Sequence, residues 1–233
     1  MYKEMKPEKI YIDSIPALIW GKKSEKAYIF VHGKKSCKEY AKQFASVAES
    51  RGYQTISFDL PEHGERTDGE RCDVWNGKKD LKIIADYAFG RWKSVSLFAC
   101  SLGAYFSLEA LNGYKLQKAL FLSPIVDMRL LTENMMLWSD VSVERLEREK
   151  EIPTSIDTLR WDCYNYIISH PVTKWNIPTA ILYGGKDNLQ PKEMVEDFCK
   201  RFGAVLTVSA ESEHPFMTEG DEKILEEWYF ENI

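Results

Sequence analysis

The sequence has no apolar run long enough to cross a membrane, because a spanning helix needs about 20 consecutive apolar residues. Its five cysteines are odd in number, scattered and without a C-x-x-C pair, which argues against a disulfide framework or a zinc site. Basic residues are not in excess: 31 Lys and Arg stand against 36 Asp and Glu, so the net charge of −5 does not indicate nucleic-acid binding. The stretch 1–10 is polar and lacks the apolar segment of a signal peptide. Together these absences predict a reduced, cytoplasmic protein without a membrane span.

The chain of 233 residues is 44% apolar, which suits one globular domain of generous size, or a domain with a modest insertion. Short apolar runs that are apolar throughout are typical of strands covered on both faces of a parallel sheet. Such runs lie at 27–31, 55–60, 95–99, 119–123, 179–185 and 204–209.

Amphipathic segments alternate with these runs, and we expect them to be helices. They cover 38–52, 78–90, 103–111, 191–203 and 221–233. Strand–helix alternation predicts an α/β fold, with a mostly parallel sheet covered by helices on both faces. The first apolar stretches, "IYIDSI" and "ALIWG", alternate more strictly and predict an antiparallel hairpin at the sheet edge.

The segment 125–176 interrupts this rhythm. It holds no convincing strand, and we expect two helices in it, near 142–151 and at 155–169. Fifty residues without a strand, between two strands, predict an inserted helical cap. The chain then divides into a core of 1–124 and 177–233 and a cap of 125–176.

Polar residues follow nearly every apolar run. Ligands of open α/β sheets bind at the carboxyl ends of the strands, so these residues are expected to gather at one rim. Successive runs are followed by His32-Gly33-Lys34, Asp59, Ser101, Asp187 and His214.

Ser101 lies in Ala99-Cys100-Ser101-Leu102-Gly103, where an apolar run changes to helical spacing. Small residues two before and two after a serine are typical of a strained strand-to-helix turn that exposes its hydroxyl. The serine then sits at a helix N-terminus, which favours developing negative charge. We therefore interpret Ser101 as a candidate nucleophile; in the alternative reading it is only a small turn residue.

A serine nucleophile needs a base, and the base needs an orienting acid. His214 in "ESEHPF" and Asp187 in "GGKDNLQP" follow the last two runs, which gives the order Ser101, Asp187, His214. Asp127 is a rival for the acid because it also follows a run. Cys100 adjoins the serine and is expected to point into the core.

Five motifs resemble the α/β-hydrolase family, specifically its serine esterase, lipase and aminopeptidase-like branch with a small helical cap. They are "FVHGKKS", "FDLPEHGER", "FACSLGA", "LYGGKDNLQP" and "SEHPF", and they span most of the chain. The resemblance implies Ser101 as nucleophile, His214 as general base and acid, and Asp187 as its orienter. It also implies an oxyanion hole from the backbone amides of Leu102 and Lys34, and no metal or organic cofactor.

This chain departs from the family pattern at two places. Ala99 stands where most members have glycine, and two lysines follow His32-Gly33 where many relatives carry apolar residues. The second departure bears on the oxyanion donor and the acyl pocket.

The resemblance implies a carboxylesterase acting on small acyl esters through an acyl-enzyme. Alternatives on the same triad are an acyltransferase, a thioesterase or a prolyl-type aminopeptidase; a non-catalytic ligand-binding protein is a further alternative. The partner is then a small-molecule ester or acyl substrate, and the oligomeric state does not follow from the sequence. Methionine and aromatic residues suit an adaptable apolar pocket. We expect such a pocket in the cap, lined by Met135, Met136, Trp138, Trp161 and Tyr164; the same residue types equally suit a cap that packs onto the sheet, and we expect about half of them to pack.

Overall fold

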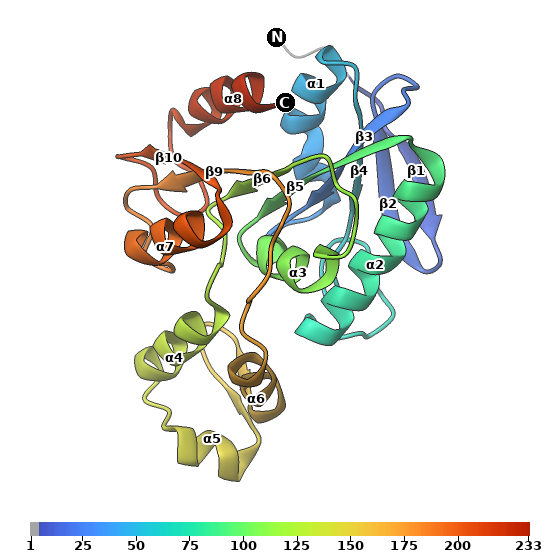
Figure 1. Cartoon of the computed structure of the whole chain (residues 1–233). Helices are drawn as coiled ribbons and strands as arrows, with labels where there is room; N and C mark the ends of the chain where they lie inside the picture. Colours follow the sequence, from blue (N-terminus) through green and yellow to red (C-terminus); the bar gives the residue numbers. More distant parts are fainter. Residues whose placement is uncertain (1–4) are drawn as a thin grey trace.

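The computed structural model describes residues 5–233, so the first four residues of the expected core and of the polar N-terminal stretch lie outside the described part. An eight-stranded sheet runs through the molecule in the order β1-β2-β4-β3-β5-β6-β9-β10 (Figure 1). Its strands are β1 (Glu8–Ile12), β2 (Ile15–Trp20), β3 (Lys26–Val31), β4 (Gln54–Phe58), β5 (Ser94–Cys100), β6 (Ala119–Leu122), β9 (Thr179–Gly184) and β10 (Val205–Ser209).

The sheet is mostly parallel, as the sequence predicts. Only β1 with β2 and β2 with β4 pair antiparallel among the described strands of this sheet, so the N-terminal hairpin forms its edge. The central strands β3, β5 and β6 are parallel and in register, with Val31 opposite Ala99 and Ala99 opposite Phe121. The carboxyl ends of these strands therefore meet at one rim, where the candidate residues of the sequence gather.

Helices cover both faces of the sheet. The helices are α1 (Lys42–Ser50), α2 (Val74–Arg91), α3 (Leu102–Leu111), α4 (Met128–Trp138), α5 (Val143–Glu149), α6 (Trp161–Ser169), α7 (Lys192–Phe202) and α8 (Asp221–Asn232), and a 3₁₀ turn at Lys38–Ala41 precedes α1. On one face α1 and α8 enclose an aromatic cluster around Phe44, Phe98 and Tyr229. On the other face α2, α3 and α7 pack over the second core (Figure 1). No helix within residues 5–233 is long and apolar enough to span a bilayer.

The last strand differs from its prediction. We expect 204–209 to be buried on both faces, but β10 is the edge of the sheet and much of it is exposed, with Val205 66% exposed. An apolar run of five residues fits an edge strand as well as a central one, because length and composition do not report position in the sheet.

The segment between β6 and β9 leaves the sheet and forms the lower part of the molecule in Figure 1. The expectation of two helices and no strand is wrong here. The segment contains three helices, α4, α5 and α6, and a small antiparallel hairpin, β7 (Glu151–Pro153) with β8 (Thr158–Arg160). The second expected helix begins only at Trp161, because 154–157 turns and Thr158–Arg160 pairs with β7.

Local signals explain these differences. Asp127 caps α4 by accepting a hydrogen bond from the Leu130 amide at 2.9 Å, a helix start that the sequence contained. Each hairpin strand has three residues, which is too short to show a period of two.

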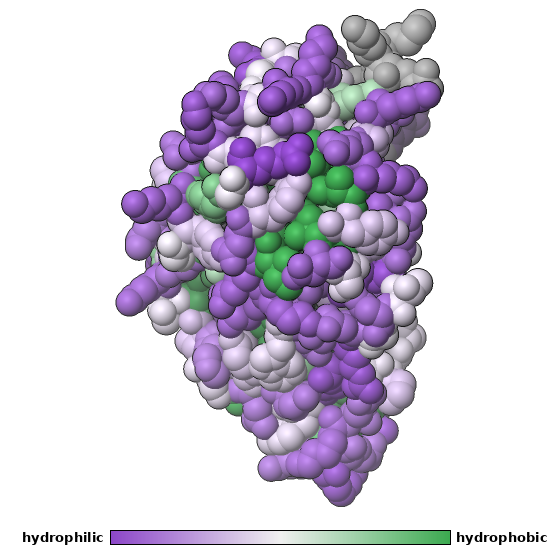
Figure 2. Space-filling model, turned by 90° about the vertical axis from the view of Figure 1, so that its right-hand side faces the viewer, coloured by the Kyte–Doolittle hydropathy of each residue, from purple (hydrophilic) through white to green (hydrophobic). Residues whose placement is uncertain are grey.

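Figure 2 shows that the lower end of the molecule is mostly polar on the face drawn, whereas a hydrophobic area lies higher up.

Candidate active site

Ser101 lies on the sharp turn between β5 and α3. Its backbone angles, φ +51° and ψ −118°, are ones that residues other than glycine rarely adopt. A methyl group on Gly103 would lie 2.5 Å from the carbonyl oxygen of His32, so the position two after the serine accepts only glycine. Ala99, two before, is completely buried. The small residues in the sequence are therefore what allow this turn.

Ser101, His214 and Asp187 come together at the rim, from three loops far apart in sequence. The Ser101 Oγ lies 2.7 Å from the His214 Nε2, and the His214 Nδ1 lies 2.7 Å from the Asp187 Oδ2. The Asp187 side chain is fully buried, and 8% of the His214 side chain is exposed. The other Asp187 oxygen accepts hydrogen bonds from the amides of Leu189 and Gln190. These bonds fix the carboxylate so that it faces the imidazole.

A buried carboxylate holds the loop that carries His214. Asp221 accepts hydrogen bonds from the Ser212 hydroxyl at 2.6 Å and from the amide and hydroxyl of Thr218. Burial alone would raise the pKa of Asp221, but these hydrogen bonds outweigh it and lower the pKa. The aspartate therefore stays charged at neutral pH and pins the loop on both sides of His214.

Gln190 is a site residue that the sequence analysis missed. Its side chain is fully buried, and its Oε1 accepts hydrogen bonds from the amides of Val126 and Asp127 at 3.0 and 2.8 Å. It thus ties the Asp187 loop to the start of the segment that leaves the sheet. A glutamine beside a proline gives no signal for such a role, because its partners are backbone groups more than 60 residues away.

Asp127 and Cys100 have other roles. Asp127 caps α4 and makes no hydrogen bond with His214. Burial raises the pKa of the Cys100 thiol to about 12, so this thiol stays protonated and unreactive at neutral pH. The geometry at the rim therefore favours Asp187 over Asp127 and Ser101 over Cys100.

Solved structures of other proteins share this arrangement of sheet and helices over nearly the whole chain. Est1E from Butyrivibrio proteoclasticus with ferulic acid bound has 17% sequence identity and a TM-score of 0.76, over 96% of each chain. The mouse α/β hydrolase domain-containing protein 10 has 19% identity and a TM-score of 0.73, over 94% of this chain and 95% of the mouse chain. The chain has the α/β-hydrolase fold.

A third similar structure is an esterase from Pyrococcus furiosus, with 18% identity and a TM-score of 0.71, over 97% of this chain and 88% of the other. No family model and no curated protein sequence matches the chain. The predicted fold class and the family resemblance in fold are thus confirmed by structural similarity.

In this α/β-hydrolase fold, the loop after β3 runs beside the serine. A methyl group on Gly33 would lie only 3.1 Å from the Cβ of Ser101. His32 holds the loop: its Nε2 accepts from the Leu60 amide at 3.1 Å, so its Nδ1 carries the proton and donates to the Gly33 carbonyl at 2.7 Å. Burial lowers the pKa of His32 to about 4, so it is neutral and acts as a structural residue.

His63 holds the next residue of the same loop. Its Nε2 accepts from the Lys35 amide at 3.0 Å, and its Nδ1 then donates to the Pro61 carbonyl. Lys34 therefore lies between two backbone positions that are fixed by imidazoles. Its amide and that of Leu102, the first residue of α3, are the predicted oxyanion donors; the first amides of a helix have no partner within it.

An ion pair of two buried side chains anchors the loop after β4. Asp59 is fully buried and accepts from both the amide and the ammonium group of Lys38, at 2.9 and 2.7 Å, and from the Glu65 amide. Burial alone would lower the pKa of Lys38, but hydrogen bonds to Asp59 and Glu39 outweigh it and raise the pKa. Asp59 thus fixes the loop that carries His63.

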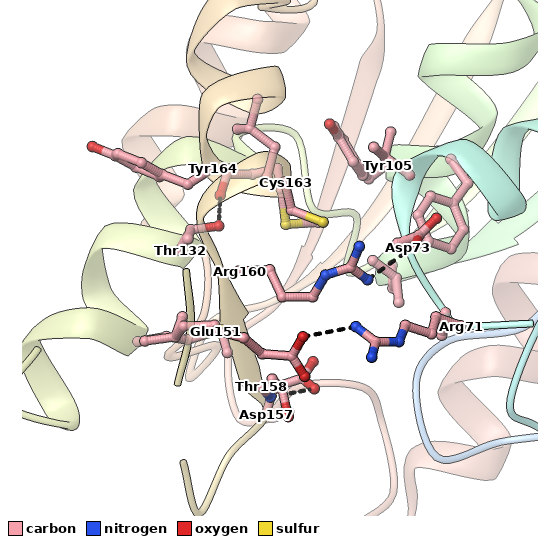
Figure 3. Close-up of a pocket in the computed structure, with 18 of the residues that line it drawn as sticks. Arg71, Asp73, Tyr105, Thr132, Glu151, Asp157, Thr158, Arg160, Cys163 and Tyr164 are labelled. Atoms are coloured by element: carbon pink, nitrogen blue, oxygen red, sulfur yellow. Dashed lines mark hydrogen bonds and ion pairs between the residues drawn. The ribbon is translucent and has the colours of Figure 1, made fainter. Parts of the chain in front are cut away.

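A cavity of about 350 Å³ opens beside Leu102, between the core and the segment that leaves the sheet (Figure 3). Core residues Tyr105 and Phe106 of α3 line one side, and residues of α4, the β7–β8 hairpin and α6 line the other. Figure 3 shows Arg71, Arg160, Glu151 and Asp157 together near the hairpin, with Tyr105, Cys163 and Tyr164 at the opposite side. The cavity is therefore part apolar and part charged.

Two of the five predicted pocket residues line this cavity, namely Met135 and Tyr164. The other three do not line it. Met136 is 4% exposed and packs inside a separate core of the 125–176 segment, and Trp161 packs against that core. Trp138 is 49% exposed at the end of α4. A helix turns neighbouring residues to different sides, so adjacent methionines cannot share one wall.

Within residues 5–233, no group of three or more His, Cys, Asp or Glu side chains is arranged to hold a metal ion.

Proposed function

We propose that the chain is a serine hydrolase that cleaves carboxylic esters with small acyl groups. One observation carries the proposal: two 2.7 Å hydrogen bonds link Ser101 to His214 and His214 to a buried Asp187. A serine hydroxyl is a weak nucleophile unless a base removes its proton, and this chain of contacts supplies the base and its orienter.

In the first step, the Ser101 Oγ attacks the ester carbonyl while its proton passes to the His214 Nε2. Asp187, held by two backbone amides, keeps the His214 Nδ1 protonated and so leaves Nε2 free to accept. It also stabilises the imidazolium that forms. The carbonyl oxygen becomes negative and lies near the amides of Leu102 and Lys34.

In the second step, the tetrahedral intermediate collapses and His214 protonates the leaving alcohol. Water then attacks the acyl-enzyme with His214 again acting as base, which releases the acid and restores Ser101. The turn at the start of α3 supports this chemistry, because amide dipoles there favour negative charge at the oxyanion.

The cavity supports a small substrate. Its volume of about 350 Å³ lies at the lower end of ordinary ligand pockets, which range from about 300 to 1,000 Å³. Its lining includes the charged side chains of Arg71, Glu151, Asp157 and Arg160, which a long alkyl chain would meet. The similar structures agree with ester chemistry, since one is an esterase and another holds ferulic acid, a small carboxylic acid.

Hydrolysis of p-nitrophenyl esters with two to twelve acyl carbons tests the proposal. We expect kcat/KM to be highest for acyl chains of a few carbons and to fall at least tenfold by twelve, because the cavity is small and partly charged. Release of p-nitrophenolate gives the rate, and the enzyme-free rate for each ester is the control. Absence of hydrolysis at every chain length in folded protein would contradict the proposal.

A further inference from the structure

The β7–β8 hairpin forms one side of the cavity and is attached to the core by charge. Three ion pairs cross from the hairpin to different core segments: Asp157 with Lys34, Glu151 with Arg71 at 2.8 Å, and Arg160 with Asp73 at 3.1 Å. Two of them are drawn in Figure 3. Because these are direct contacts, a movement of the hairpin also moves the core side chains with which it pairs.

The pair with Lys34 differs from the other two. Arg71 precedes α2 and Asp73 caps it, whereas Lys34 follows Gly33, which runs beside Ser101. The backbone on either side of Lys34 is already held, by His32 at Gly33 and by His63 at Lys35. The Lys34 side chain is held in addition by its ion pair with Asp157.

The Asp157 carboxylate is itself in a fixed position. Its Oδ1 accepts from the Thr158 amide at 2.8 Å, and its carbonyl oxygen accepts from the amide and hydroxyl of Thr154. These bonds form the tight turn of the hairpin and leave Oδ2 to pair with the Lys34 ammonium group. The turn thus presents one carboxylate oxygen to the loop beside Ser101.

We propose that Asp157 is a positioning residue, which acts through its ion pair with Lys34 to hold the backbone amide of Lys34, a predicted oxyanion donor. The position of the β7–β8 hairpin therefore affects how well the oxyanion of the transition state is stabilised. This inference rests on the proposed hydrolase function. The side chains of Lys34 and Asp157 are 36% and 41% exposed, so the effect of the pair is modest and sensitive to salt.

Asp157→Asn tests the inference, with Glu151→Gln as the matched variant. The asparagine keeps the Oδ1 acceptor for Thr158 and removes only the charge toward Lys34. Glu151→Gln breaks the Arg71 ion pair of the same hairpin without touching the loop beside Ser101. Both variants loosen the hairpin, so both are expected to raise KM for p-nitrophenyl acetate.

Only Asp157→Asn is expected to lower kcat, by about fivefold, the upper range for one exposed ion pair. The affinity for a trifluoromethyl ketone, which forms a tetrahedral adduct with serine, is expected to fall by the same factor. Exchanging the charges in Lys34→Asp with Asp157→Lys is expected to restore most of kcat. High salt is expected to bring the wild-type kcat toward that of Asp157→Asn.

Equal kcat values for Asp157→Asn and Glu151→Gln, with the wild type active, would overturn the inference and leave the hydrolase proposal standing. If the wild type neither hydrolyses the ester nor reacts with the ketone, the proposed function fails, and this inference fails with it.

Discussion

Ser101→Ala is expected to lower kcat for p-nitrophenyl acetate by about 10⁶-fold, leaving at most the rate that binding and oxyanion contacts support without a nucleophile. The Ser101 Oγ is the only atom removed, and its 2.7 Å contact with His214 is the one through which the proton leaves. Initial rates at saturating ester, compared with the enzyme-free rate, measure the loss.

A nearby serine provides the control. Ser107 is fully buried in α3, and its hydroxyl donates to the Gly103 carbonyl at 2.7 Å without contact to His214. Ser107→Ala is expected to keep kcat within about threefold, because loss of one buried hydrogen bond costs only about 1 kcal/mol of folding free energy. Retention of more than one hundredth of the wild-type kcat by Ser101→Ala would rule out the assigned nucleophile.

Asp187→Asn is expected to lower kcat by about 10⁴-fold, because the amide no longer holds His214 with its proton on Nδ1. The asparagine Oδ1 can still accept from the amides of Leu189 and Gln190, so the loop keeps its shape. The loss of kcat is then due to the altered proton transfer and not to a change of structure. A melting temperature of Asp187→Asn equal to that of the wild type verifies this.

Asp127→Asn separates the two carboxylates that the sequence leaves as rivals. Asparagine caps a helix about as well as aspartate, so the Leu130 contact and the start of α4 persist. The kcat of this variant is expected to stay within a few-fold of the wild-type value. A large loss in Asp127→Asn with little loss in Asp187→Asn would show that the acid is misassigned.

The sequence predicts the sheet and its rim well because the signals are local. A buried parallel strand shows itself as a short apolar run, and the residue at its end is then placed by the topology. Ser101 is predicted for the same reason, because the small residues Ala99 and Gly103 indicate a turn at which another backbone segment lies close. His214 and Asp187 follow from chain order together with the family resemblance.

The sequence fails where partners are distant or elements are short. The β7–β8 hairpin has three-residue strands, and its place is set by ion pairs with Lys34, Arg71 and Asp73, which no local pattern reveals. Gln190 acts through backbone groups of another segment. Which cap residues line the cavity does not follow from the sequence, because composition marks Met136 as apolar without indicating the side of its helix on which it lies.

Covalent labelling by a fluorophosphonate, located by mass spectrometry of peptides, tests whether Ser101 is the activated nucleophile. The reagent modifies serine hydroxyls that an adjacent base activates, whatever the natural substrate. We expect one adduct per chain, on Ser101, and none in Ser101→Ala or after prior reaction with an ester-like inhibitor. An unlabelled Ser101 in folded protein, or an adduct on another residue that survives Ser101→Ala, would contradict the account.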